Sequence, residues 1–227
     1  MLDVAGKVST YNRANRFKAV LGEPTYDASF CEPSDTVIFA DAEFVVCPTL
    51  GSFLPYWYLL IPRDAHLNFA DWSTEHPNRC VSSEIKRIFL NKLGDDSKYI
   101  WFEHGPATTG SITGCGVDHA HLHILMNSAV SIDDILMGAA EFGVDNWQEV
   151  DVDQIYTRRN ECDEYLAFGN GARGFLKNLK SAAGTQFFRR VLAHLSGYGE
   201  VWDYKSHPYQ ENAQLSVNRF APEAVSG

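Results

Sequence analysis

The sequence predicts an α+β fold in which helices flank an antiparallel sheet. Two observations support this prediction. From residue 37 onward, short segments rich in β-branched and aromatic residues follow one another, and turn residues separate them, as in consecutive strands. Between the third and the fourth of these segments, apolar residues recur with the period of a helix. Runs of strands with an intervening helix are typical of α+β proteins with an antiparallel sheet.

The first 36 residues are expected to precede the sheet as a lead segment. A short helix is predicted over residues 10–21, because Gly22 and Pro24 would end it there. The rest of the segment is irregular and rich in Pro, Ser and Asp. We therefore expect the folded core to begin at residue 37.

Residues 37–128 are expected to form the core domain, with about five strands. These strands are predicted at residues 37–39, 44–47, 56–61, 99–103 and 117–126. A helix is predicted over residues 78–93, because its apolar residues share one face and Gly94 follows as a stop signal.

Residues 129–227 are expected to form a C-terminal α/β extension that packs on the core. Its elements are predicted to be a helix over residues 132–142, a strand near residues 165–168 and a helix over residues 185–195. Arg189 and Arg190 fall on the polar side of the last helix, which predicts a solvated face, although guanidinium groups also suit phosphate. The chain from Gly197 is not assigned to any element.

Composition excludes several classes of protein. Nineteen Lys and Arg against 29 Asp and Glu give a formal net charge of −10, which argues against bulk binding to a nucleic-acid backbone. The longest apolar run, residues 53–61, is too short to span a bilayer, and no secretory signal is evident at the N-terminus. The five cysteines include no C-x-x-C pair, which favours free thiols. We therefore expect a cytoplasmic protein without a membrane partner.

Three histidines, His119, His121 and His123, alternate with apolar residues. In an extended strand, alternate side chains share a face, so these rings would line one surface while the apolar residues point into the core. A helix would scatter the rings around its axis. Three neutral imidazoles on one face can bind a metal, or one can be a nucleophile or base that the others orient.

Both possibilities stay open on the residues alone. His-x-His on a strand is common in metal sites, but hydrolytic zinc sites generally add a carboxylate or a further histidine nearby. Asp118 would point to the opposite face of a regular strand, which leaves His66 and His104 as distant candidates for a further ligand.

The segment His119–Leu125 fits the His-φ-His-φ-His-φ-φ signature of the histidine triad (HIT) superfamily of nucleotide hydrolases and transferases, where φ is an apolar residue. The resemblance covers residues 37–126, because a strand that ends in Ile-Pro-Arg, a following histidine (His66), a helix and a further strand precede the triad in the superfamily's order. It implies a HIT-like antiparallel sheet and an enzyme that acts on nucleotides.

The resemblance also implies a mechanism. The central histidine, here His121, would attack the α-phosphorus of a nucleotide to form a covalent nucleotidyl-imidazole, which water or a second acceptor would resolve. His123 would contact phosphoryl or leaving-group oxygens, and His119 would orient His121, partly through its backbone carbonyl. We expect a hydrolase, or else a transferase, for nucleoside phosphoanhydrides, phosphoesters or phosphoramidates. A nucleotide is then the small-molecule partner, and no cofactor is needed.

Five further residues make up the expected phosphate- and nucleotide-binding set, and none is assigned to a metal. Gly114, Cys115 and Gly116 precede the triad in a loop whose backbone N–H groups can approach phosphate oxygens, although glycine serves a plain turn equally well. His66 lies where the superfamily often has a histidine next to the active site. His104 is either an added acid or phosphate contact, or a loop histidine.

Some positions depart from the superfamily's pattern. Residues 48–51 lack the acidic residue that binds ribose in many members, and Trp57 stands where some branches have a histidine. Two alternative functions are a metal-dependent hydrolase or metal-binding protein and a non-catalytic nucleotide-binding module. Superfamily members are often homodimers, which the additions at both ends of this chain would either preserve or cover.

Overall fold

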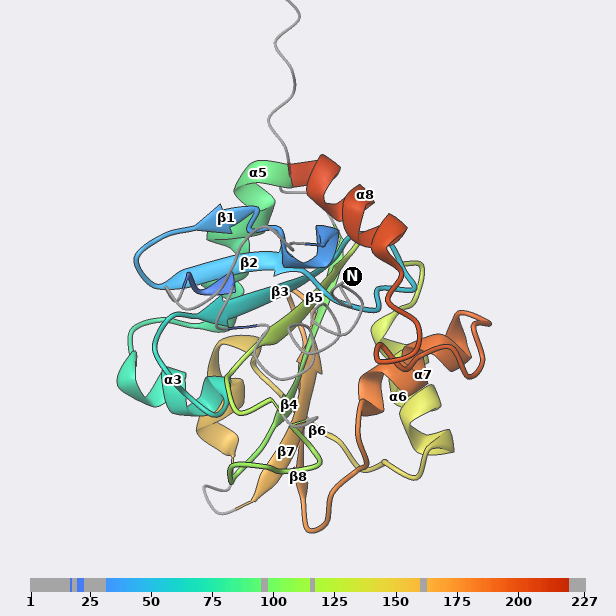
Figure 1. Ribbon diagram of the computed structural model, residues 1–227. Coiled ribbons are helices and arrows are strands. Elements are labelled where there is room, and N and C mark those ends of the chain that lie inside the picture. Colours follow the sequence, from blue (N-terminus) through green and yellow to red (C-terminus); the bar gives the residue numbers. More distant parts are fainter. Residues whose placement is uncertain are drawn as a thin grey trace, which may run out of the picture.

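The computed structural model describes residues 17, 20–22, 32–94, 98–114, 117–159 and 163–220. Within these residues, eight strands form one antiparallel sheet in the order β1-β2-β3-β5-β4-β7-β8-β6 (Figure 1). The strands are β1 (Phe39–Ala40), β2 (Phe44–Pro48), β3 (Trp57–Pro62), β4 (Tyr99–Gly105), β5 (Leu122–Met126), β6 (Gln148–Val150), β7 (Glu164–Gly169) and β8 (Gly174–Leu179).

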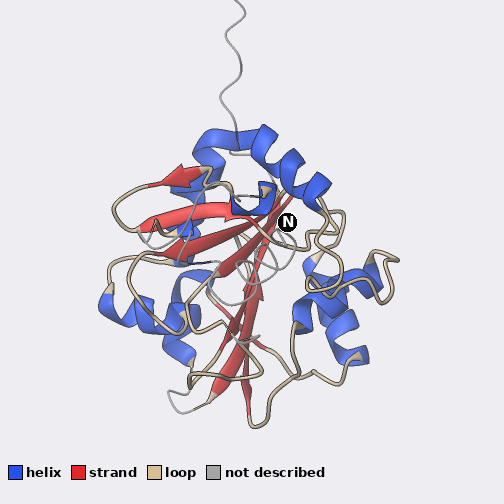
Figure 2. Cartoon of the chain, in the orientation of Figure 1, coloured by secondary structure: helices blue, strands red, loops and turns tan. Residues whose placement is uncertain are grey.

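Helices cover both faces of this sheet (Figure 2). One face carries α3 (Phe69–Glu75), α4 (Val81–Ile85), the π-helical segment η3 (Lys86–Leu90), α5 (Asn91–Leu93), the 3-10 helix η4 (Val152–Arg158) and α8 (Gln210–Phe220). The other face carries α6 (Ile132–Glu141) and α7 (Phe187–Leu195), which lie side by side. A short 3-10 helix, η2 (Pro33–Asp35), precedes β1 and contacts α8.

The predicted α+β class is confirmed, but the prediction of about five strands is wrong. β7 pairs with β4, and β8 and β6 follow it, so the strands after residue 147 continue the same sheet. The side chain of Asn170 holds the turn between β7 and β8, because it accepts hydrogen bonds from the backbone N–H groups of Ala172 at 2.8 Å and Arg173 at 2.9 Å. β6 has three largely exposed residues and no apolar alternation that would identify it.

The predicted helix over residues 78–93 corresponds to the continuous run of α4, η3 and α5, which Gly94 ends with a φ of +103°. The helix predicted over residues 10–21 falls almost entirely outside the described residues. Of that region the structure describes Phe17, Val20, Leu21 and Gly22. Val20 is buried against β2 and β3, on the face of the sheet that α6 and α7 also cover.

The strand predicted over residues 117–126 is shorter in the structure, because pairing with the neighbouring strands begins only at Leu122. The residues just before Leu122 are held by a hydrogen bond outside the sheet. The backbone N–H of Ala120 donates to the carbonyl of His66, at 2.7 Å, rather than to a neighbouring strand. Within β5, His123 lies opposite Leu59 of β3 and Phe102 of β4, so it sits between two strands in the middle of the sheet.

A buried carboxyl group links β4 to the helices α3 and η4, which cover one face of the sheet. Glu103 is 1% exposed and accepts hydrogen bonds from the Phe69 backbone N–H at 2.6 Å, from the Tyr156 hydroxyl at 2.7 Å and from the Tyr165 hydroxyl at 2.8 Å. Burial raises its pKa to about 7, although these three donors act in the opposite direction. Glu103 thereby ties the N-terminus of α3 to the sheet.

Because the pKa of Glu103 is higher in the folded state than its ordinary value of 4.5, ionisation of this group opposes folding. The stabilising contribution of the neutral Glu103 carboxyl is therefore fully present below about pH 4.5 and is lost as the pH rises through 7. We expect the free energy of unfolding of the wild type to fall by about 3 kcal/mol relative to that of Glu103→Gln between pH 4 and pH 8. Urea unfolding at a series of pH values measures this difference, and parallel profiles would contradict it.

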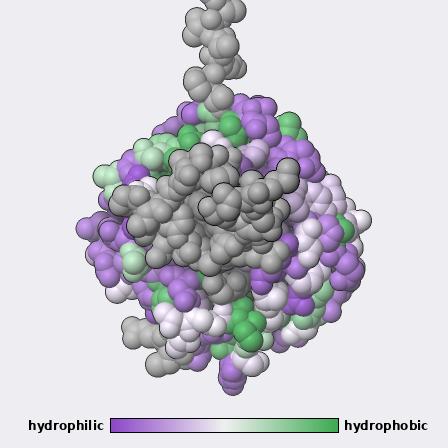
Figure 3. Space-filling view, in the orientation of Figure 1, coloured by the Kyte–Doolittle hydropathy of each residue, from purple (hydrophilic) through white to green (hydrophobic). Residues whose placement is uncertain are grey.

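The coloured part of the surface in Figure 3 is largely hydrophilic, with small, separate hydrophobic areas. In the described part of the chain, no helix combines the length and the apolar content needed to cross a membrane.

Candidate functional site

The three predicted site histidines lie close together. The ring centroids of His121 and His123 are 5.3 Å apart, and the ring of Phe17 contacts both His121, at 5.1 Å, and His119, at 6.0 Å. His123 belongs to β5 and is buried, whereas His119 and His121 precede the strand and are half-buried. One ring is thus enclosed by the core, and the other two lie nearer to the surface.

Backbone carbonyls determine which nitrogen of His119 and His121 carries a proton. Nδ1 of His121 lies 2.9 Å from the carbonyl oxygen of His119, and Nε2 of His119 lies 2.7 Å from that of Pro62. A carbonyl oxygen can only accept, so each of these nitrogens is the donor. A neutral His121 therefore keeps its lone pair on Nε2, which is the atom a nucleophilic imidazole uses.

His123 has the opposite arrangement. The indole Nε1–H of Trp57 donates to Nδ1 of His123 at 3.1 Å, so Nδ1 is unprotonated and the proton of the neutral ring is on Nε2. The ring stacks on Phe102, with centroids 4.6 Å apart and planes 10° apart. Trp57 is fully buried, as expected for an aromatic core residue in a strand, and it also bonds to a site histidine.

His104 lies beside this cluster but faces the helix α7. Its ring is 6% exposed, its centroid is 6.3 Å from that of His123, and its Nε2 accepts a hydrogen bond from the Phe188 backbone N–H at 3.3 Å. Burial, followed by the positive charges of nearby groups, lowers its pKa to about 3. His104 is therefore neutral at pH 7, and its Nε2 is occupied by the first turn of α7 rather than directed to a ligand.

The prediction that Arg189 lies on a solvated helix face is wrong. Arg189 is 4% exposed, and its guanidinium donates to the carbonyls of Gly51 at 2.6 Å and Leu50 at 2.5 Å and to the Thr49 hydroxyl at 2.9 Å. Its Cζ lies 4.6 Å from the centroid of the Trp57 ring. The helical period predicted Arg189 on the polar side of α7, but the loop after β2 and the rings of Trp57 and Tyr204 cover that side.

The remaining predicted ligand-binding residues are only partly placed. Gly114 is buried against Pro106, where a Cβ atom would lie 3.0 Å from the proline ring, and Cys115 and Gly116 are outside the described residues. The loop that contains Gly114 is fixed to β7 by hydrogen bonds from Ser111 and Thr113 to Glu164. The described part of this loop is thus anchored to β7.

His66 is joined to the triad segment through its backbone, as described above, and its side chain is also buried. Its Nδ1 lies 3.9 Å from the Glu75 carboxylate, and its Nε2 has no hydrogen-bond partner among the described residues. The contacts of His66 therefore tie it to α3 and to the chain before β5.

Phe17 lies against two of the site rings, which sequence reasoning did not anticipate. Its edge contacts with His119 and His121, together with the packing of Phe17 and Leu21 on the cluster around Val20, place this part of the lead segment over the half-buried histidines. Phe17 therefore covers part of the His121 ring.

Removing this ring should expose His121. We expect Phe17→Ala to raise the rate at which diethyl pyrocarbonate modifies His121 severalfold, as read by peptide mass spectrometry. The matched control is Phe142→Ala, because Phe142 makes the same kind of edge contact, at 5.8 Å, with His194 on the outer helices. An unchanged rate at His121 in Phe17→Ala would show that Phe17 does not shield it.

Among the described residues, no three His, Cys, Asp or Glu side chains are arranged so that they could hold a metal ion. Within the triad, one ring nitrogen of each histidine is already hydrogen-bonded. Nε2 of His119 bonds to Pro62, Nδ1 of His121 to a carbonyl, and Nδ1 of His123 to Trp57.

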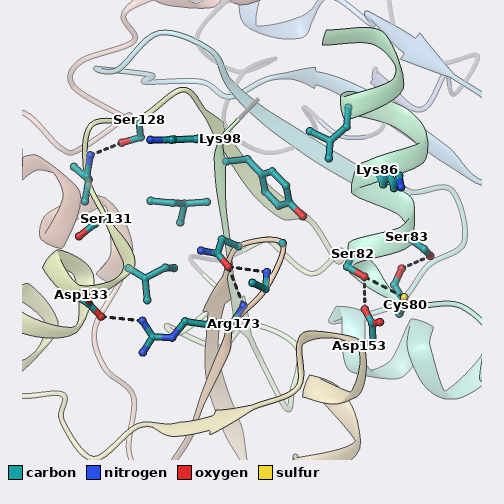
Figure 4. Close-up of a pocket in the computed structure, with 18 of the residues that line it drawn as sticks. Cys80, Ser82, Ser83, Lys86, Lys98, Ser128, Ser131, Asp133, Asp153 and Arg173 are labelled. Carbon is teal, nitrogen blue, oxygen red and sulfur yellow. Dashed lines mark hydrogen bonds and ion pairs between the residues drawn. The ribbon is translucent and has the colours of Figure 1, made fainter. Parts of the chain in front are cut away.

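A cavity of about 890 Å³ lies at the other end of β5 from His121. Ser128, beyond the end of β5, and Tyr99, at the start of β4, are among the residues that line it. Figure 4 shows Arg173 next to Asp133 on one wall and Ser82 next to Asp153 on the other. It contains none of the predicted site residues, and these polar groups bond to one another.

The chain matches no protein-family model and no curated protein sequence. Solved structures similar to it include the crystal structure of yeast Ap4A phosphorylase Apa2, with 14% identity, a TM-score of 0.33 and 62% of this chain covered. The complexes of that enzyme with AMP and with Ap4A have 12% identity, TM-scores of 0.31 and 0.33, and 63% and 74% of this chain covered. The chain covers 57%, 59% and 73% of these three structures, less than two thirds of the first two.

Proposed function

We propose that this protein cleaves nucleotides at the α-phosphate through a covalent nucleotidyl-histidine intermediate on His121. The observation that carries the proposal is the pair of opposite tautomers in adjacent rings. His121 has its proton on Nδ1 and a lone pair on Nε2, whereas His123 has its proton on Nε2. One ring is thus prepared to attack, and the other to donate a hydrogen bond.

In the first step, the Nε2 lone pair of His121 forms a bond to the α-phosphorus, and the bond from phosphorus to the leaving group breaks. The leaving group takes the electron pair of that bond. His121 becomes positively charged during this step, and its Nδ1–H donates to the His119 carbonyl at 2.9 Å. That hydrogen bond strengthens as the charge develops, so it stabilises the transition state more than the ground state.

In the second step, water attacks the phosphorus, the bond to Nε2 of His121 breaks, and the proton that the water loses is released to solvent. The products are a nucleoside monophosphate and the leaving group, and His121 returns to its neutral form. The Nε2–H of His123 bonds to a phosphoryl or leaving-group oxygen in the first step and to a phosphoryl oxygen in the second. Splitting one displacement into two in this way predicts ping-pong kinetics when a second acceptor replaces water.

Turnover of a substrate panel tests this proposal. The panel contains dinucleoside polyphosphates, nucleoside phosphoramidates and nucleoside monophosphate esters, and release of the nucleoside monophosphate is measured. We expect turnover of at least one class, and we expect it to persist in protein treated with a chelator. Activity that disappears with chelation and returns with added metal would favour a metal-dependent hydrolase. Saturable nucleotide binding with no product would favour a non-catalytic binding module.

A further inference from the structure

We propose that Trp57 is a positioning residue that holds His123 in the tautomer with its proton on Nε2, so that this N–H can donate to the leaving group. The inference rests on the proposed function for the role of that proton. The hydrogen bond itself is a property of the folded protein and can be measured without a substrate.

The sheet register brings the indole to the imidazole. Trp57 of β3 lies opposite Leu125 of β5, and His123 is two residues away from Leu125 on the same face. The two rings have centroids 5.8 Å apart and an interplanar angle of 64°, which directs the indole Nε1–H at Nδ1 of His123. A one-residue change of register would turn Trp57 to the opposite face.

The chemistry of the indole makes this contact selective. An indole N–H can only donate, whereas an imidazole nitrogen donates or accepts according to its tautomer. The contact is therefore satisfied only when Nδ1 of His123 is unprotonated. A His123 with a proton on Nδ1 would place two donors 3.1 Å apart in a site where both rings are at least nine-tenths buried. Phe102 stacks on His123 and restricts rotation of the ring away from this geometry.

Trp57 is itself restricted by Arg189. The guanidinium lies 4.6 Å from the centroid of the indole and is fixed by three hydrogen bonds to residues 49–51. A cation on an aromatic face is attracted by the ring electrons, and the attraction is stronger where both groups are desolvated. Arg189 of α7 thus restricts Trp57, and Trp57 bonds to His123. The loop after β2 fixes Arg189 in turn.

The first experiment detects the hydrogen bond directly. In full-length protein labelled with ¹⁵N, a scalar coupling across the hydrogen bond between Nε1 of Trp57 and Nδ1 of His123 arises only if Nδ1 accepts. We expect this coupling in the wild type, together with the ¹⁵N shift of an unprotonated Nδ1. In Trp57→Phe, we expect His123 to become a mixture of tautomers. A protonated Nδ1 in the neutral wild-type ring, or the absence of the coupling, would overturn the proposal.

The second experiment measures how the loss of this hydrogen bond affects departure of the leaving group. We expect Trp57→Phe to lower kcat about tenfold on a dinucleoside polyphosphate, the size of one lost hydrogen bond, with little change in KM. On a nitrophenyl ester of a nucleoside monophosphate, whose leaving group needs less stabilisation, the loss should be smaller. The matched control is Trp101→Phe, because Trp101 is equally buried on the opposite face and donates to the Asn170 carbonyl.

Equal losses on the two substrates, or the same pattern in Trp101→Phe, would overturn the role of Trp57 in leaving-group departure. Protein that shows the coupling but turns over no substrate would contradict the proposed function while supporting the tautomer assignment. The two failures are therefore distinguishable.

Discussion

Replacing His121 by Asn is expected to lower kcat by a factor on the order of 10⁴ or more. Asn retains polarity but has no nitrogen lone pair that can form a bond to phosphorus, so the covalent step has no nucleophile. The loss should appear in kcat, and nucleotide affinity should change little, because the contacts of His119 and His123 with neighbouring groups remain. Steady-state kinetics and equilibrium binding of a nucleoside monophosphate measure the two quantities separately.

The matched control for this variant is His194→Asn. His194 lies at the exposed end of α7, where it pairs with Glu141 at 2.9 Å, so its replacement should leave turnover unchanged. Turnover by His121→Asn at a rate close to that of the wild type would exclude His121 as the nucleophile.

Acidification is expected to destabilise the fold through His104. The pKa of His104 in the folded state, about 3, lies below its ordinary value of 6.5, so the neutral ring contributes stability above pH 6.5. That contribution is lost as the pH falls toward 3, because the unfolded chain takes up the proton first. The loss amounts to about 3 kcal/mol between pH 7 and pH 4.

His104→Gln tests this expectation, because Gln keeps an acceptor for the Phe188 N–H but does not titrate. We expect the variant to be less stable at pH 7 but to lose about 3 kcal/mol less than the wild type between pH 7 and pH 4, as measured by urea unfolding. A fall in pH is expected to destabilise the fold through His104 but to stabilise it through Glu103, so the effects of the two groups can be told apart. Identical acid profiles for the wild type and His104→Gln would contradict a buried neutral His104.

Local sequence patterns were sufficient to predict the elements that surround the histidines. The period-2 pattern predicted a strand through His119, His121 and His123, but of these only His123 lies in β5, although the rings of His121 and His123 contact each other. The helical period and Gly94 predicted the run from α4 to α5. The helix prediction succeeded because it depends on residues that are close in the sequence.

The sequence could not predict contacts between distant segments. Arg189 has the spacing of a solvent-facing residue on α7, and only the fold brings the carbonyls of Leu50 and Gly51 to it. The bond from Trp57 to His123 likewise depends on the register of β3 and β5. No local signal in the sequence indicated that Trp57 would donate a hydrogen bond to His123.

α8 was missed for a different reason. It is mostly polar, and its buried positions include the small residues Ala213 and Ser216, which produce little hydrophobic signal. Phe220 supplies its main apolar contact, with Tyr58 and Phe89 on the face opposite α6 and α7. A helix of this kind is identified by its packing rather than by its pattern.

The covalent intermediate is the central claim, and intact-mass measurement after a rapid alkaline quench tests it most directly, because phosphorus–nitrogen bonds are labile in acid. We predict that wild-type protein mixed with a substrate gains the mass of one nucleotidyl group. Peptide mapping should place this group on His121, and His121→Asn should gain nothing. A protein that turns over the substrate but never carries the added mass, or that carries it on another residue, would contradict this mechanism.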